Sequence, residues 1–131
     1  MGPPDPEVVH QAIEDHSKIF RDLLLGFVKV HVLHHASQEP IYGSGIMEDL
    51  DRHGYELSAG TLYPLLHGLD SADFLRRDTR VVDGKVRKYY EITPLGQRAL
   101  EEARRKIIEL VAEIMETDWV PSRSGAEGAD G

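Results

Sequence analysis

The dipeptide Asp83-Gly84 constrains the fold of this 131-residue chain more than any other short stretch. It separates two runs in which apolar and polar residues alternate, FLRRDTRVV and VRKYYEIT. An Asp-Gly pair suits the positive φ angles of a two-residue hairpin turn, so the pattern predicts two strands joined by a tight turn. Alternation sends Tyr89 and Tyr90 to opposite faces of the second strand, and one of them is expected in the core.

Helical periodicity dominates the chain before this hairpin. Asp5-Pro6 predicts the start of a short leading helix, and a longer apolar helix follows it and ends before Pro40. A second helical segment is predicted for Tyr42–His53, and a third begins at the capping residue Ser58. The core side of this third helix is predicted to consist of Leu62, Leu65, Leu66 and Leu69.

After the hairpin, Thr93-Pro94 predicts the start of a long final helix, with threonine as its cap and proline in its first turn. The helix carries a long apolar stripe, made of Leu95, Ala99, Leu100, Ala103, Ile107, Leu110, Val111 and Ile114. Because this stripe exceeds what a small domain can cover alone, we expect it to form a dimer interface rather than a core.

The charge of the chain is unevenly distributed. Its net charge is −8, but residues 76–90 hold six basic side chains against two acidic ones, a local charge of +4. Attraction to phosphate is local and is screened beyond about 10 Å at moderate salt, so the acidic total does not exclude a nucleic acid partner. Three helices followed by a basic hairpin is the order of a winged helix-turn-helix, whose third helix enters the major groove while the hairpin, or wing, reaches along the backbone.

We therefore expect a mainly α-helical chain with a small β-hairpin, in the α+β class. The predicted parts are an N-terminal extension with a helix (1–18), a winged helix-turn-helix DNA-binding domain (19–93), a C-terminal dimerisation helix (94–119) and a disordered tail (120–131).

Small and polar residues at the start of the third helix are the first candidates for DNA contact. Gly60 lets the backbone approach a phosphate closely, and the free amides of a helix start favour an anion. On the wing, long cationic side chains can meet sugar and phosphate. The candidate DNA-binding residues are Tyr42, Ser58, Gly60, Thr61, Tyr63, Pro64, His67, Arg80, Lys85, Arg87 and Lys88. Other roles stay open, because Tyr63 could fill a groove between helices and the Ser58 and Thr61 hydroxyls could be simple caps.

Several classes of protein are disfavoured by what the chain lacks. It has no cysteine, hence no disulfide framework, zinc ribbon or thiol nucleophile, and no apolar run reaches the ~20 residues of a membrane span. His31 and His35 have the spacing of two metal ligands on one helix face, but no third ligand is fixed by the sequence. We expect a soluble cytoplasmic protein that is not an enzyme and has no metal site, cofactor or membrane partner.

Three motifs resemble the PadR family of transcription regulators, over residues 20–116. They are YGSGIMEDL (42–50), SAGTLYPLLHGLDSADFL (58–75) and RKYYEITPLG (87–96). GTLYP joined to RKYYEIT at this distance is highly specific. The chain departs from the family at Asp73, where glycine is usual before the first wing strand, and this departure concerns only the geometry of that turn.

The resemblance implies a homodimeric repressor that binds an inverted-repeat operator in promoter DNA. In this family the final helix pairs with its partner's with help from the N-terminal helix, and many members are released by a small aromatic or drug-like effector. Trp119 would cap the dimer interface or line a pocket for such an effector. The predicted dimerisation residues are Leu23, Phe27, Leu100, Ala103, Ile107, Leu110, Val111 and Ile114.

A second hypothesis rests on the negative net charge, which disfavours binding to DNA. In this reading the chain keeps the winged fold as a protein-interaction module and no longer binds DNA. Alanine at Arg80, Lys85, Arg87 and Lys88 separates the two, because only a DNA-binding protein would lose affinity for every DNA sequence.

Overall fold

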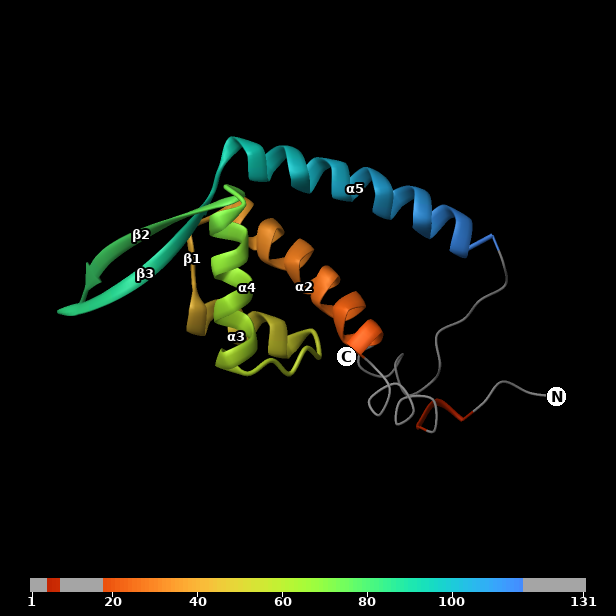
Figure 1. Cartoon of the computed structure of the whole chain (residues 1–131), viewed down its shortest axis with the longest axis horizontal. Helices are drawn as coiled ribbons and strands as arrows, with labels where there is room; N and C mark the ends of the chain where they lie inside the picture. The colour runs from red at the N-terminus through yellow and green to blue at the C-terminus, as the bar shows by residue number, and fades with distance from the viewer. Residues whose placement is uncertain (1–4, 8–17, 117–131) are drawn as a thin grey trace.

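The computed structural model describes residues 5–7 and 18–116, and within them the helices and strands follow the predicted order (Figure 1). Helices α2 (Lys18–Gln38), α3 (Gly43–Arg52) and α4 (Ala59–Ser71) come first. Strands β2 (Leu75–Val82) and β3 (Lys85–Ile92) form the hairpin, and α5 (Pro94–Ile114) ends the described chain. The expected α+β class is confirmed. Most of the predicted leading helix, Trp119 and the C-terminal tail lie outside the described residues.

The helix boundaries have local causes. Helix α2 ends at Gln38, before Pro40, and α3 ends ahead of Gly54, whose φ of +86° suits glycine. At the start of α5, Oγ1 of Thr93 accepts a hydrogen bond from the Gly96 N–H at 3.0 Å, as the threonine cap predicts. The final helix ends at Ile114, five residues earlier than its predicted boundary.

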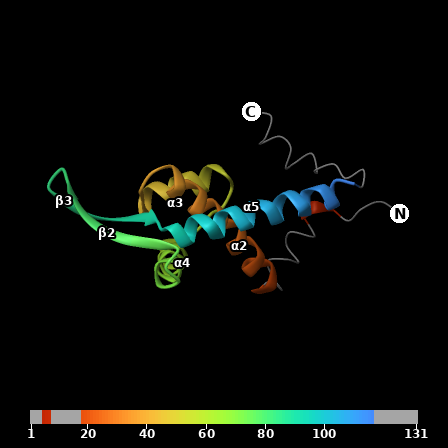
Figure 2. The same ribbon diagram turned by 90° about the horizontal axis from the view of Figure 1, so that it is seen from above.

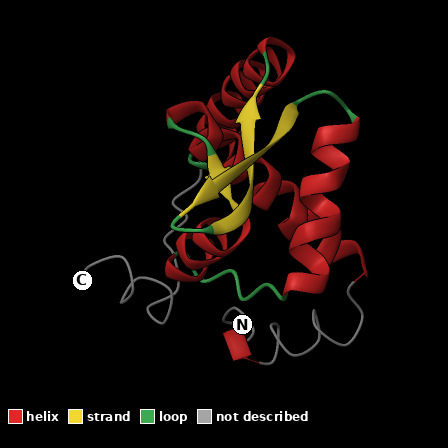
Figure 3. Ribbon diagram, turned by 90° about the vertical axis from the view of Figure 1, so that its left-hand side faces the viewer, coloured by secondary structure: helices red, strands yellow, loops and turns green. Residues whose placement is uncertain are grey.

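The predicted hairpin is confirmed, and a third strand that the sequence did not predict joins it. A short strand, β1 (Ile41–Tyr42), pairs with β3 and gives an antiparallel sheet in the order β1-β3-β2 (Figure 3). Ile41 lies opposite Tyr90 and Tyr42 opposite Tyr89. The predicted Asp83-Gly84 turn is confirmed, because both residues have positive φ, 53° and 76°. The tip of the hairpin extends away from the helices (Figure 2).

The core lies between the helices and the base of the sheet. The four predicted leucines of α4 are buried, and Tyr90 is the buried member of the tyrosine pair, with 1% of its surface exposed. The hydrophobic core consists of Val28, Val32, Leu33, Ala36, Ile41, Ile46, Leu50, Leu62, Leu65, Leu66, Leu69, Leu75, Tyr90 and Leu100. Burial of these side chains fixes α4 with one face inward and leaves its opposite face to solvent.

The junction between the wing and α5 is tightly built. A side chain at Gly96 would collide with the Phe74 carbonyl oxygen, which accepts the Thr93 N–H at 3.1 Å. Asp73 has a φ of 65°, so it occupies the left-handed region that the family's usual glycine favours. Its carbonyl accepts the Thr93 hydroxyl. Aspartate therefore keeps the turn expected for glycine at this position.

Tyr90 carries a buried hydroxyl with no hydrogen-bond partner among the described residues, and burial raises its pKa above 10.0. An unsatisfied buried hydroxyl contributes nothing to offset its desolvation. We expect Tyr90→Phe to leave the free energy of unfolding unchanged or to raise it by about 1 kcal/mol. Tyr90→Ala, the control that removes the ring, should cost about 3–5 kcal/mol. Urea unfolding measures both, and a Phe variant as unstable as the Ala variant would contradict this role.

Among residues 5–7 and 18–116, no helix combines the length and the hydrophobicity needed to cross a lipid bilayer.

Candidate nucleic-acid interface

The exposed face of α4 consists of uncharged or weakly basic side chains. Gly60, Tyr63, Pro64 and His67, four of the predicted DNA-binding residues, recur at helical spacing and all are exposed. The buried leucines occupy the other side of the helix. Helix α4 therefore presents one face that a DNA groove could receive.

The first turn of α4 has free backbone amides. Ser58 is the N-cap, but its hydroxyl accepts no hydrogen bond from a described amide of the helix, which corrects the simple capping role. Instead, Ser58 Oγ donates to Thr61 Oγ1 at 3.3 Å. The amides of Ala59 and Gly60 have no intrahelical acceptor, and this makes the helix start a suitable site for a phosphate.

Arg21 of α2 is a cation at this helix start that sequence reasoning did not select. Its guanidinium donates to Thr61 Oγ1 at 3.0 Å. Arg21, Ser58 and Thr61 also line one cavity beside the turn that precedes α4. In the sequence, Arg21 is only a basic residue near the start of α2. Nothing in the sequence links it to Thr61, which lies 40 residues further along the chain.

Glycine at position 60 has no packing reason within the described chain. A Cβ there would meet only Ser58 Oγ at 3.8 Å, an ordinary contact distance. Glycine in a helix is unfavourable relative to alanine by about 1 kcal/mol. An external group that approaches the backbone closely would account for the glycine.

Tyr63 has a structural contact as well as an exposed surface. Its ring covers Gly43, the first residue of α3, where an added Cβ would lie 2.6 Å from Tyr63 Cζ. Forty per cent of the Tyr63 surface nevertheless remains exposed. Both alternatives left open by the sequence are therefore compatible with the position of this side chain.

An open groove of about 410 Å³ joins α3, α4 and the wing. It is lined by Tyr42, Gly43, Ser44, Tyr63, Val86, Arg87 and Lys88. The Arg87 guanidinium lies 4.9 Å from the centroid of the Tyr42 ring, a cation–π contact that holds the arginine at the groove. Four predicted DNA-binding residues thus meet in one place. Ser44, in the first turn of α3, was missed because nothing in the sequence places it beside the wing.

The predicted wing cations differ in whether they form ion pairs within the wing. Arg80 bonds to Glu91 at 2.7 Å and to Asp78 at 3.1 Å, and its guanidinium lies 4.9 Å from the Tyr89 ring centroid. These contacts hold the Arg80 side chain within the wing, so it is less available to a phosphate than the other wing cations. Within the described residues, Lys85, Arg87 and Lys88 form no such ion pair and are exposed. The register places Lys85 and Arg87 on one face of β3 and Lys88 on the other.

Apolar faces of α2 and α5 remain open to solvent. Leu23, Phe27, Ile107, Leu110, Val111 and Ile114 are all exposed, as dimerisation residues of a single chain should be. Ala103 is half-buried. Leu100 is only 1% exposed and belongs to the core, so its predicted role at the interface is wrong. Sequence periodicity missed this because the first half of α5 packs on α2 and β3 within its own chain. Ile108 and Met115 are exposed as well.

His31 and His35 of α2 lie beside His53, which follows α3. The rings of His31 and His53 have centroids 5.0 Å apart. Burial, together with the neighbouring histidines, lowers the pKa of His31 and His35 below 6.5. The fold thus supplies a third imidazole that the sequence alone could not place.

Three helices, an exposed third helix and a hairpin with free cations define a winged helix-turn-helix protein. The profile described as "Transcriptional regulator PadR-like family" matches residues 32–102, more than half of the chain. The chain belongs to this family of transcriptional regulators, and the expectation that it is not an enzyme is confirmed.

Individual relatives agree with this assignment. "Transcriptional regulator Rv3488" of Mycobacterium tuberculosis is 43% identical over 95 residues, which cover 72% of this chain and 89% of the relative. A PadR family regulator from Eggerthella lenta superposes with a TM-score of 0.64 at 32% identity, covering 82% of this chain and 98% of the other. A PadR-like regulator from Bacillus cereus gives 0.67 at 29% identity, covering 72% and 94%.

Proposed function

We propose that the protein is a homodimeric repressor that binds an inverted-repeat operator in promoter DNA. Helix α4 enters the major groove, and Lys85, Arg87 and Lys88 of the wing contact the backbone. The observation that carries the proposal is the groove in which Tyr42, Tyr63, Arg87 and Lys88 meet. The cytoplasmic location expected from the sequence forms part of the same proposal.

The proposal is tested by fluorescence anisotropy on DNA from upstream of the protein's own gene. Specific binding should fall steeply as salt rises, because cations that neutralise phosphates release counterions. Shuffled DNA of the same length controls for non-specific affinity. Equal affinity for the two DNAs at every salt concentration would contradict the proposed operator binding.

Dimerisation is proposed to use the open faces of α2 and α5. The two helices diverge toward the C-terminal end of α5, so no other described helix or strand covers its last turns (Figure 1). Leu110 lies within this uncovered part and has 49% of its surface exposed. A second copy of the chain would remove this apolar surface from water.

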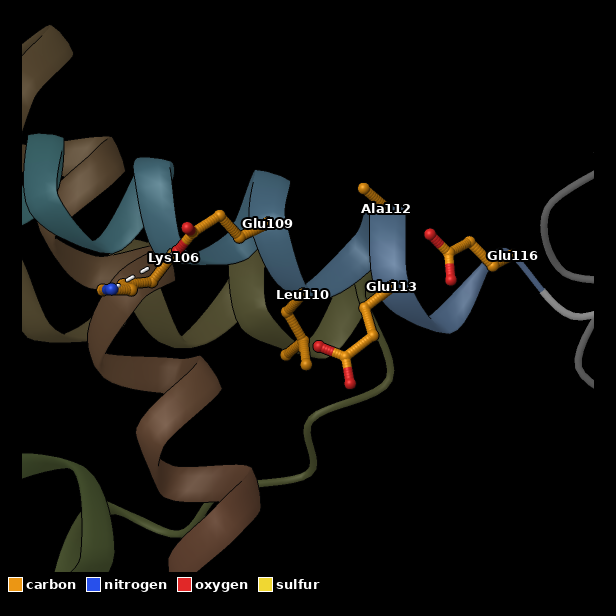
Figure 4. Close-up of a pocket in the computed structure, with 6 residues that line it drawn as sticks. All are labelled: Lys106, Glu109, Leu110, Ala112, Glu113 and Glu116. Carbon is orange, nitrogen blue, oxygen red and sulfur yellow. Dashed lines mark hydrogen bonds and ion pairs between the residues drawn. The ribbon is translucent and has the colours of Figure 1, made fainter.

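We expect Leu110→Glu to weaken the dimer at least about 100-fold, because the interface would bury an unpaired charge. Ala112→Glu is the control, since Leu110 and Ala112 point to different sides of α5 (Figure 4). Sedimentation velocity at micromolar concentration measures both variants. A wild-type chain that sediments as a monomer, or equal dissociation of the two variants, would contradict the interface.

An apolar cavity of about 310 Å³ between α2 and α5 is the proposed effector site. Phe27, Val30, Tyr55, Leu100 and Ile107 supply its apolar wall, and His31, His34 and Arg104 its polar groups. This composition suits a planar aromatic compound that carries an acceptor or negative charge for Arg104. Trp119, the residue predicted for this role, lies outside the described residues. A thermal-shift screen of aromatic acids, repeated with operator DNA present, tests the site.

A further inference from the structure

We propose that His31, His35 and His53 bind a divalent metal ion of the Zn²⁺ class. This inference is independent of DNA binding and replaces the expectation that the chain has no metal site. The sequence alone places only His31 and His35 together, one helical turn apart. The fold brings His53 to them from the end of α3.

The geometry suits a tetrahedral ion. One ring nitrogen from each of the three histidines lies within 4.8 Å of those of the other two. Bonds of 2.0–2.1 Å to a tetrahedral Zn²⁺ place ligand nitrogens about 3.4 Å apart. The rings would have to approach by about 1.4 Å at most, which side-chain rotation can supply because His53 is exposed. Water would occupy the fourth position.

The donor set determines the class of metal. Imidazole nitrogens suit Zn²⁺, Co²⁺, Ni²⁺ and Cu²⁺, whereas Mg²⁺ and Ca²⁺ require oxygen ligands. Three neutral imidazoles and a water also avoid placing several negative charges in a half-buried site. Zn²⁺ should therefore bind and Mg²⁺ should not.

Asp49 of α3 is a positioning residue for this site. Its Oδ2 lies 3.8 Å from His35 Nδ1, and its other carboxylate oxygen pairs with Arg52. A small shift would let Asp49 accept a hydrogen bond from the Nδ1–H, which leaves Nε2 of His35 for the metal. Carboxylates that orient ligating histidines in this way are common around zinc.

The ion would link separate parts of the helix-turn-helix. His31 and His35 belong to α2, while His53 immediately precedes Gly54 and the turn that leads to α4. A ligand that binds only the folded arrangement stabilises it by mass action. The melting temperature of the wild-type chain should rise by about 10 °C when free Zn²⁺ is about 100 times its dissociation constant.

The test uses the full chain without an affinity tag, freed of metal by a chelator. Calorimetric titration with ZnCl₂ should give one ion per chain, and MgCl₂ should give no binding. We expect His35→Gln and His53→Gln to lose at least about 100-fold in Zn²⁺ affinity, and Asp49→Asn about tenfold. His34→Gln, on the same helix but outside the cluster, is the matched control and should bind like the wild type.

Two further measurements distinguish metal binding from misfolding. Circular dichroism without metal should show the same helix content in His53→Gln and wild type, while only the wild type gains thermal stability with Zn²⁺. Co²⁺ should give the visible absorption of a tetrahedral site in the wild type and lose it in His53→Gln. Absence of saturable binding, or Zn²⁺ affinity unchanged in both His35→Gln and His53→Gln, would overturn the proposal.

Discussion

Simultaneous replacement of Lys85, Arg87 and Lys88 by alanine should reduce affinity for DNA at least about 100-fold at moderate salt. The loss should be similar for operator and unrelated DNA, because the wing contacts phosphates and sugars rather than bases. The plot of log binding constant against log salt concentration should become less steep, its slope shrinking in magnitude by about 3 for each chain. Fluorescence anisotropy at several salt concentrations measures the affinity and the slope together.

The matched control removes the same charge from a different surface. Arg98, Arg105 and Lys106 are exposed residues of α5. Arg105 pairs with Glu102 of the same helix, and Lys106 pairs with Glu109 (Figure 4). Their triple alanine variant has the same net charge as the wing variant, yet it should bind DNA almost like the wild type. Equal losses in the two variants would show that overall charge, not the wing, governs affinity. An unchanged wing variant would favour the protein-interaction module instead.

Gly60→Ala should separate DNA binding from stability. The new methyl group has space within the described chain, and alanine favours the helix by about 1 kcal/mol over glycine, so the melting temperature should stay level or rise. The same methyl group would hold a phosphate away from the amides of the first turn. Loss of one charge-assisted hydrogen bond corresponds to about tenfold or more in affinity.

Gly68→Ala is the control for this substitution. Gly68 lies in the same helix, and an added Cβ there meets no described atom within 4 Å. It should therefore give a similar gain in stability without loss of DNA affinity. If Gly60→Ala bound the operator as tightly as Gly68→Ala, no phosphate would approach the start of α4 closely.

The parts of the fold with local causes were predictable. The Asp83-Gly84 turn, the Thr93 cap and the buried leucines of α4 depend on residues that are close in sequence or repeat at helical spacing. Strand β1 was not predictable, because two residues form a strand only when β3 is beside them. The same holds for Leu100, whose burial depends on contacts with other elements of the fold.

The candidate sites also combine features that the local sequence predicts with features that depend on contacts between distant residues. Residue type and helical spacing identified the exposed face of α4 and the cations of the wing. Pairing between distant residues then changed the roles of single side chains, since Glu91 engages Arg80 and Arg21 reaches Thr61. The histidine cluster shows most clearly what the sequence could not predict, because His31 and His35 lie on α2 while His53 lies at the end of α3.

The exposed face of α4 has a consequence for how such a regulator can evolve. It carries neither lysine nor arginine, and bidentate contacts from those two residues are the commonest way to recognise guanine. Under the proposed function, the wing sets the affinity for DNA of any sequence, while Tyr63, Pro64 and His67 determine which sequence is preferred. Binding strength and target preference would then be encoded on separate structural elements. Substitutions on α4 could redirect the protein to new promoters without altering the electrostatic attraction that brings it to DNA.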